Sequence, residues 1–339
     1  MDSFFFLLFL ITVATQAEPP TRAEMDLYNA VFVDNVEQVE AAIKAGADFN
    51  IVYSNGQTPL MMAAVLGSVP VVKLLLERGA KTTILSADGV TALQQAFFAE
   101  NEGVVRAFVE HGGDVDRLDP ELGTNPLVEA INWGELPIIQ MLLEMGANVN
   151  AVDGMGVNPL RSAAMWGRKD VMEVLLSRGA LTNERGDDQE TALMIVILSR
   201  GSPQDIMEMF NLLLAHSANV NLQDKHGYTA LMYVVTERQE HVEFAGRLIQ
   251  AGANIHLTDT YGYTALMFAS RQGHLRIVQL LLGSGADVTA ETPWGETAVG
   301  MAENEGIREL LYRALSVAHT EFHPHAAAAR RLKARAVFA

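Results

Sequence analysis

Apolar and polar positions recur along this chain in one short phrase. In most copies a glycine and one further residue precede a Thr or Asn, and a mostly apolar run follows. Measured at the Thr or Asn, successive copies lie 33, 34, 33, 33, 38, 35 and 33 residues apart. A period this regular predicts stacked copies of one supersecondary unit. The phrase reads "GQTPLMMAA" at 56, "GVTALQQAF" at 89, "GTNPLVEAI" at 123, "GVNPLRSAA" at 156, "ETALMIVI" at 190, "GYTALMYVV" at 227, "GYTALMFAS" at 262 and "GETAVGMAE" at 295.

A second apolar block follows the phrase and closes on a turn, as in "VVKLLLERGA" and "IIQMLLEMGANVN". Apolar residues at helical spacing predict another helix, and the glycine predicts its end, because glycine adopts a left-handed C-terminal cap without steric cost. The Thr that heads the phrase suits a helix N-cap, and the Pro in "TPL" suits the first helical position. One unit is therefore expected to be helix, turn, helix, turn, which makes the fold class an all-α solenoid.

These phrases resemble the ankyrin repeat, whose hallmark Thr-Pro-Leu-His and Gly-Ala-Asp-Val-Asn segments are matched by "TPLM" and "GANVN". The resemblance covers residues 24–315 and implies an ankyrin-repeat solenoid of about nine units, in which residues 24–54 lack the entry phrase as an N-terminal capping repeat would. The expected units lie near 24–54, 55–87, 88–121, 122–154, 155–187, 188–225, 226–260, 261–293 and 294–315.

One family residue is missing from every copy. In the family a His after the Leu usually braces the hairpin loop by hydrogen bonds, so the resemblance leaves the local stability of the hairpins in doubt. The position is held here by Met61, Gln94, Val128, Arg161, Met194, Met232, Met267 and Gly300.

The first residues have the pattern of an export signal. An apolar run from Phe4 to Val13 is followed by small residues and then by Glu18-Pro19-Pro20. This predicts a signal peptide over 1–17, cut after Ala17, and a linker over 18–23. The run is short for a membrane span. We expect an exported protein, periplasmic if bacterial and otherwise secreted, with no membrane association after cleavage; the alternative is a cytoplasmic protein that keeps its N-terminus.

Charge and composition narrow the partner. The net charge of −17 argues against a nucleic-acid surface, because phosphate binding needs clustered Lys and Arg. With 49% hydrophobic and 19% charged residues the chain can build a core. There are no cysteines, which excludes disulfides, thiolate zinc sites and cysteine nucleophiles. We expect a monomer that binds a protein partner.

Residues with the spacing of a catalytic site are not found. The chain has no P-loop, no Gly-x-Ser-x-Gly elbow and no His-Glu-x-x-His motif. The dense histidine group is His319, His323 and His325 with Glu321, in a C-terminal tail expected over 316–339. An enzyme or metal-binding protein using this tail is the alternative of another class. The expectation is a protein that is not an enzyme and has no cofactor and no metal site.

The resemblance also indicates where a partner would bind. In similar proteins the ligand surface is the concave face, formed by hairpin tips and by the two residues before the Gly that ends the inner helix. The eight copies of the phrase give eight such pairs of residues. The first five pairs are mostly apolar, and the last three are polar: Thr236 and Glu237, Arg271 and Gln272, Asn304 and Glu305. Exposed apolar patches mark partner sites. The expected binding residues are Val65, Leu66, Phe98, Asn132, Trp133, Met165, Trp166, Leu198, Tyr228, Tyr261, Tyr263 and Trp294.

Trp133 and Trp166 are the expected anchors, since Trp is enriched among the residues that dominate binding energy. The alternative is that these side chains fill gaps against the next repeat. The function expected from the whole sequence is a non-catalytic protein–protein interaction scaffold or regulator that binds its partner along the concave groove. A secreted effector that targets host proteins is the alternative of the same class.

Overall fold

The computed structural model describes residues 19–112, 115–116, 118, 123–199 and 201–322. These residues contain 18 helices and no strand beyond two isolated β-bridges, so the predicted all-α repeat solenoid is confirmed. The chain divides into two compact units, Met1–Gly154 (unit 1) and Met155–Ala339 (unit 2).

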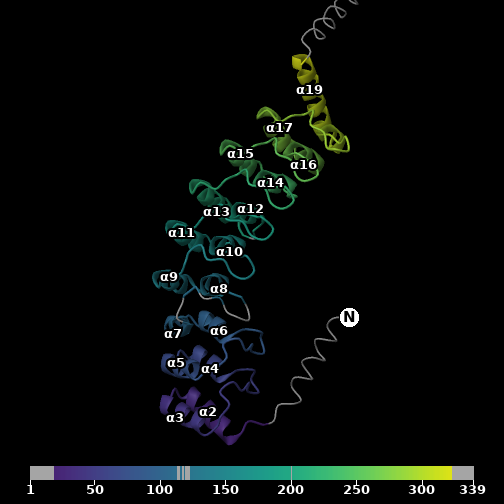
Figure 1. Ribbon diagram of the computed structural model, residues 1–339. Helices are drawn as coiled ribbons and strands as arrows, with labels where there is room; N and C mark the ends of the chain where they lie inside the picture. The colour runs from purple at the N-terminus through teal and green to yellow at the C-terminus, as the bar shows by residue number, and fades with distance from the viewer. Residues whose placement is uncertain (1–18, 113–114, 117, 119–122, 200, 323–339) are drawn as a thin grey trace, which may run out of the picture. The chain divides into compact units, whose positions relative to one another are not determined.

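Unit 1 consists of paired helices in which the first helix of each pair is called inner and the second outer. The inner helices α2, α4, α6 and α8 contact one another in that order, and the outer helices α3, α5, α7 and α9 do the same (Figure 1). The bounds are α2 Arg22–Phe32, α3 Val36–Lys44, α4 Pro59–Leu66, α5 Val69–Glu77, α6 Ala92–Phe98, α7 Glu102–Gly112, α8 Pro126–Trp133 and α9 Leu136–Glu144.

Unit 2 repeats the arrangement, with inner helices α10, α12, α14, α16 and α18 in contact one after another. Among its outer helices, α13 and α15 pack less closely against each other than the other successive pairs do. The bounds are α10 Pro159–Met165, α11 Lys169–Ser177, α12 Ala192–Leu198, α13 Pro203–Ala215, α14 Ala230–Thr236, α15 Val242–Gln250, α16 Ala265–Gln272, α17 Leu275–Gly283, α18 Ala298–Met301 and α19 Glu305–Phe322.

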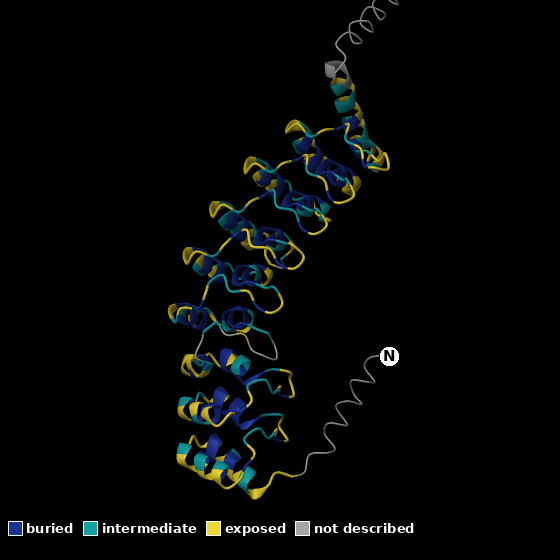
Figure 2. Cartoon of the chain, viewed as in Figure 1, coloured by how far each residue is buried: buried dark blue, intermediate teal, exposed yellow. Residues whose placement is uncertain are grey.

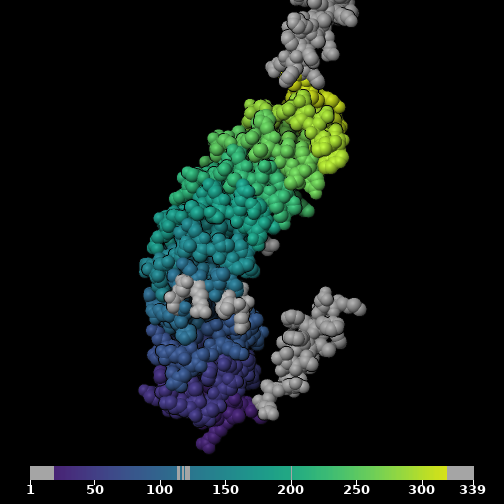
Figure 3. Space-filling view, in the orientation of Figure 1, coloured from purple at the N-terminus to yellow at the C-terminus, as the bar shows by residue number. Residues whose placement is uncertain are grey.

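The core runs along the inner helices. In α4 all six residues from Pro59 to Ala64 are buried, because the helix is covered by α2, α6 and its own outer partner α5. Burying an aliphatic or aromatic side chain contributes about 1.5–3 kcal/mol. Figure 2 shows the buried residues where helices meet and the exposed ones on the hairpin turns and outward sides of the outer helices. Within each unit, the space-filling view shows successive repeats lying directly against each other (Figure 3).

The helix starts follow the predicted chemistry. The hydroxyl of Thr58 accepts a hydrogen bond from the Met61 backbone N–H at 3.2 Å, and Asn125 and Asn158 cap α8 and α10 in the same way. The residues that replace the family's His also take part. The Met61 sulfur accepts from the Thr58 N–H at 3.4 Å, and the Gln94 side-chain oxygen accepts from the Thr91 N–H at 2.9 Å.

Arg161, which stands at the position of the family's His, bonds across the hairpin loop. Its guanidinium donates to the carbonyl of Gly156 at 2.9 Å, across the hairpin that precedes α10. The hairpin before α10 is therefore braced by a different side chain from the same position.

The last repeat differs from the sequence expectation. Helix α18 has only four residues, and Asn304 instead caps the following helix by accepting from the N–H groups of Gly306 and Ile307. The assignment of Asn304 and Glu305 to the end of an inner helix was therefore wrong, because this inner helix is one turn long. Helix α19 also continues past Leu315, the expected end of the solenoid, to Phe322.

Candidate protein-binding surface

The residues at the ends of the inner helices of unit 1 are exposed as their register predicts. Val65 and Leu66 close α4, Phe98 closes α6 and Trp133 closes α8, and about half of each side chain faces solvent. Asn132 is only partly exposed. Each of these residues lies at the end of its helix, and part of its side chain stays outside the packing between repeats.

Neighbouring repeats hold these helix ends in place. The Asn101 side-chain amide, in the connection after α6, donates to the carbonyl of Ala64 at 3.1 Å and to that of Val65 at 3.4 Å. The rings of Phe98 and Trp133 meet edge to face with centroids 5.7 Å apart. The exposed rings of Phe98 and Trp133, in successive repeats, are therefore neighbours on one surface of unit 1.

The first repeat adds two residues that sequence reasoning missed. Phe32 and Val33 end α2 and are 63% and 61% exposed. They were missed because this repeat lacks the entry phrase from which the register is counted, and it has Asp34, at φ 54°, where the next repeat has Gly67; Glu100 takes the same left-handed conformation after α6. The pattern "FVDN" before α3 is the signal that could have found them. We call the whole set the unit 1 strip: Phe32, Val33, Val65, Leu66, Phe98 and Trp133.

Unit 2 carries a shorter set. Met165, Trp166 and Leu198 are exposed at the ends of α10 and α12, and we call them the unit 2 strip. The corresponding positions at the end of α16, Arg271 and Gln272, are exposed and polar. Apolar exposure at this register thus stops after the first two repeats of unit 2.

The aromatic residues of the hairpin tips fall into two groups. Tyr261 and Trp294 are exposed, with ring centroids 6.2 Å apart. Tyr228 and Tyr263 are half-buried, and both lie against the ring of Phe268 in α16, at 5.3 and 5.6 Å. Packing therefore accounts for part of the surface of Tyr228 and Tyr263, while Tyr261 and Trp294 present most of theirs to solvent.

The acidic residues of these tips serve the turns. The Asp224 carboxylate accepts from the N–H groups of His226 and Tyr228, at 2.8 and 2.7 Å. Asp259 makes the same pair of bonds one repeat later, to the N–H groups of Tyr261 and Tyr263.

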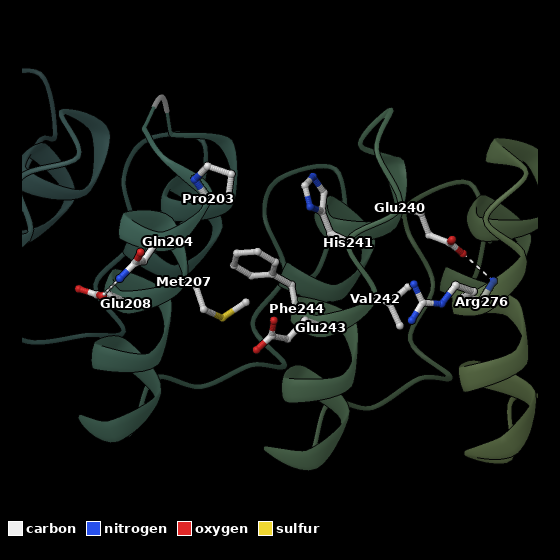
Figure 4. Close-up of a pocket in the computed structure, with 10 residues that line it drawn as sticks. All are labelled: Pro203, Gln204, Met207, Glu208, Glu240, His241, Val242, Glu243, Phe244 and Arg276. Carbon is white, nitrogen blue, oxygen red and sulfur yellow. Dashed lines mark hydrogen bonds between the residues drawn. The ribbon is translucent and has the colours of Figure 1, made fainter.

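The two repeats that are longer than the others, near 188–225 and 226–260, form hollows in unit 2. A cavity of 380 Å³ lies between the connections after α12 and α14, with Leu198 in its wall. A second hollow of 830 Å³ lies between the first turns of α13 and α15 (Figure 4). Pro203, His241 and Phe244 line both, so the two hollows adjoin. The inserted residues therefore reshape the surface directly beside the unit 2 strip.

Two carboxylates beside the larger hollow, those of Glu208 and Glu240, accept hydrogen bonds from side chains or from backbone N–H groups. A hydrogen bond from Lys169, and then one from Gln204, lowers the pKa of Glu208 below its usual value. Glu240 accepts from the backbone N–H groups of Arg276 and Ile277, at 2.6 and 3.0 Å, and so caps α17 from the neighbouring repeat. These carboxylates are consequently structural acceptors.

The residues that could hold a metal ion are not gathered together in the described part of the chain. Within those residues no three His, Asp or Glu side chains lie close enough to hold a metal ion. His323 and His325 lie outside the described residues, and the side chains of His319 and Glu321 in α19 are not described either. Among the helices of the described residues, none has the length and apolar character needed to cross a membrane.

Comparison with known proteins gives the family. A family model described as "Ankyrin repeats (3 copies)" matches residues 27–119, 99–186 and 193–292. No curated protein matches the chain. The matches end before Trp294, so the count of nine repeats stays a prediction. Ankyrin-repeat proteins generally mediate protein–protein interactions and are generally non-catalytic. With most of its length matched by this model and its helices stacked as the sequence period predicted, the chain belongs to the ankyrin-repeat family.

Proposed function

We propose that this chain acts by binding a protein partner along its exposed inner-helix ends and catalyses no reaction. The observation that supports this most strongly is the recurrence of exposed apolar side chains at one register. All four repeats of unit 1 have them, and so do the first two of unit 2. A soluble protein rarely maintains a contiguous apolar patch of this kind unless a partner covers it.

The energetics favour the two tryptophans as anchors. Trp133 and Trp166 are 44% and 55% exposed, so each has apolar surface to bury against a partner. Truncation of such an anchor typically costs about 2 kcal/mol or more, which corresponds to about a 30-fold loss of affinity. The edge-to-face contact with Phe98 limits the motion of Trp133 before binding, which reduces the entropy lost on association.

The cavity between the longer repeats extends this surface. It is lined by apolar side chains including Ile197, Ile206 and Val234, and by the polar Arg238 and Gln239 at the same connections. A mainly apolar wall with a few polar groups is typical of a site that receives a side chain of a partner. We therefore place a further contact of the partner there.

The protein is further proposed to be exported, and to lie in the periplasm if the source is bacterial. The support is the apolar run from Phe4 to Val13 followed by the small residues before Glu18.

The test is capture of a partner from the native cell fraction by the mature chain and by the Trp133→Ala, Trp166→Ala double variant. Each single variant is measured as well, because it reports on one unit alone. Tyr312→Ala is the matched control, since Tyr312 is an exposed aromatic residue on α19, away from both strips. Circular dichroism verifies that every variant stays helical.

We expect the mature chain and Tyr312→Ala to capture the same partner and the double variant to lose it. Equal capture by all of them would reject the strips as the binding surface.

A further inference from the structure

Among the described residues of unit 1, the connections that follow the inner helices contain acidic residues and no basic ones. Three of the four connections between inner and outer helices carry an acidic residue, namely Asp34, Glu100 or Glu135; Glu102 opens α7, and all four carboxylates are exposed. In the part of unit 1 that the structure describes, none of these four forms an ion pair.

The basic residues of unit 1 lie mostly elsewhere. Lys44, Lys73 and Arg78 belong to the outer helices or their ends and pair with carboxylates there. Residues 19–154 contain 7 Lys or Arg and 19 Asp or Glu, which is a net charge of −12.

The same register in unit 2 has mixed charge. Arg168 lies in the connection after α10 and Lys169 opens α11, Arg238 lies between Glu237 and Glu240 after α14, and Arg271 lies in the last turn of α16. The acidic border is therefore a property of the unit 1 strip and not of every inner-helix end in the chain. A partner segment with Lys or Arg beside its apolar residues would complement it, because opposite potentials steer encounter and fix orientation.

The spacing of the strip indicates the shape of that segment. Packed helices lie about 8–10 Å apart, so exposed apolar residues recur at about that interval across the four repeats. Two turns of an α-helix advance about 10.5 Å, which returns an apolar residue to the same face every seven positions. A β-strand covers the interval in about three residues, an odd number, so its successive contacts would alternate between opposite faces. The strip thus matches one face of a helix of about 20 residues.

We propose that the unit 1 strip binds an amphipathic helix of a partner whose apolar face is bordered by Lys or Arg. The proposal rests on the proposed function, because it names the partner class for one of the surfaces described there. The apolar residues of the helix lie over Phe32, Leu66, Phe98 and Trp133 in turn, and its basic residues lie near Asp34, Glu100 and Glu135.

The probe is a fluorescent 21-residue peptide with Leu at the a and d positions of three heptads and Lys at the e and g positions. Two peptides serve as controls: one has Glu in place of every Lys, and the other has a central Pro that breaks the helix. Binding to the mature full chain is measured by fluorescence anisotropy at low and high salt. We expect the Lys peptide to bind at least about 10-fold more tightly than either control, and its affinity to fall with salt.

Charge-reversal variants separate the strip from the general acidity of the chain. Glu100→Lys with Glu135→Lys changes the border of the strip, whereas Glu77→Lys with Glu144→Lys makes the same charge change at the ends of outer helices α5 and α9. All four glutamates are exposed, so both double variants should fold. We expect the first to lose about 10-fold in affinity for the Lys peptide and the second to lose little.

Three results would overturn the proposal: equal binding of the Lys and Glu peptides, equal binding of the helical and Pro-broken peptides, or equal losses in the two charge variants. If the Lys peptide fails in this way while the native partner is still lost on Trp133→Ala, the strip binds a partner of other chemistry and the proposed function stands. If the native partner is also captured normally by Trp133→Ala and Trp166→Ala, both proposals fail.

Discussion

The rings of Phe98 and Trp133 meet at 90° with their centroids 5.7 Å apart, although about half of each side chain is exposed. The contact joins α6 to α8, two successive inner helices, and aromatic pairs of this geometry contribute about 0.5–1.5 kcal/mol beyond the area they bury. The strip is thus part of the packing between repeats and also the surface that we propose binds a partner.

The adjacent residues Phe97 and Phe98 should differ sharply in their effect on stability. Phe97 is fully buried in unit 1, so Phe97→Ala should lower the free energy of unfolding by about 3–5 kcal/mol. Phe98→Ala removes an exposed ring and one aromatic contact, so we expect a loss of about 1 kcal/mol. Chemical denaturation followed by circular dichroism measures both. Comparable losses would show that Phe98 is a core residue and not a surface residue.

Two glycines of the hairpin tips provide a matched pair. Gly227 and Gly295 both have left-handed backbones, with φ of 81° and 79°. A Cβ atom at Gly227 would lie 2.8 Å from the Cα of Asp259 in the next repeat, whereas a Cβ at Gly295 meets no atom within 4 Å. Alanine at either position costs about 1 kcal/mol for the backbone conformation. Gly227→Ala should cost about 1–3 kcal/mol more, because the hairpins must separate.

The measurement for this pair is the midpoint of thermal or urea unfolding of the two variants. If Gly227→Ala and Gly295→Ala shift it equally, the contact between the hairpins of successive repeats does not contribute to stability.

Tyr233 should make stability sensitive to alkaline pH. Its hydroxyl donates to Asp224 at 2.7 Å and lies 3.0 Å from Glu190, and burial, followed by the bond to Asp224, raises the pKa of Tyr233 above its usual value of about 10. A raised pKa means that the stabilisation is complete below the unfolded-state pKa and is lost as the pH rises above about 10.

Tyr233→Phe should therefore lower the free energy of unfolding at pH 7 by about 1–3 kcal/mol, because the buried Asp224 carboxylate loses a donor. The difference from the unmodified chain should shrink above about pH 10, where that chain loses its own contribution. Urea unfolding at a series of pH values tests this, with Tyr312→Phe on the surface as control. A difference that stays constant with pH would contradict the role of the hydroxyl.

The native protein should begin at Glu18. If the first 17 residues are an export signal, intact-mass measurement of the native protein should show their loss. The Ala17→Asp variant should leave a longer precursor, because cleavage needs a small uncharged residue at this position. An N-terminus at Met1 in the native protein would instead favour the cytoplasmic alternative.

The sequence alone determined the repeat, the residues that cap most of the inner helices and the register of the candidate surface. These depend on local rules. The Thr58 hydroxyl caps α4 by accepting a hydrogen bond from the backbone N–H three residues further on, and Gly67 ends the helix with φ 73°. The two residues before that glycine, Val65 and Leu66, stay exposed. For this reason Val65, Leu66, Phe98 and Trp133 could be assigned to the surface from their position in the phrase.

Only the tertiary structure decided how much of each candidate is available to a partner. Tyr228 and Trp294 both occupy hairpin tips, yet Tyr228 is partly covered by Phe268 of the following repeat and Trp294 is exposed. It also added Phe32 and Val33 to the strip, because Asp34 takes the place of a glycine. Burial of a side chain in a solenoid depends on residues about one repeat away in the chain, and that contact is made only when the repeats stack.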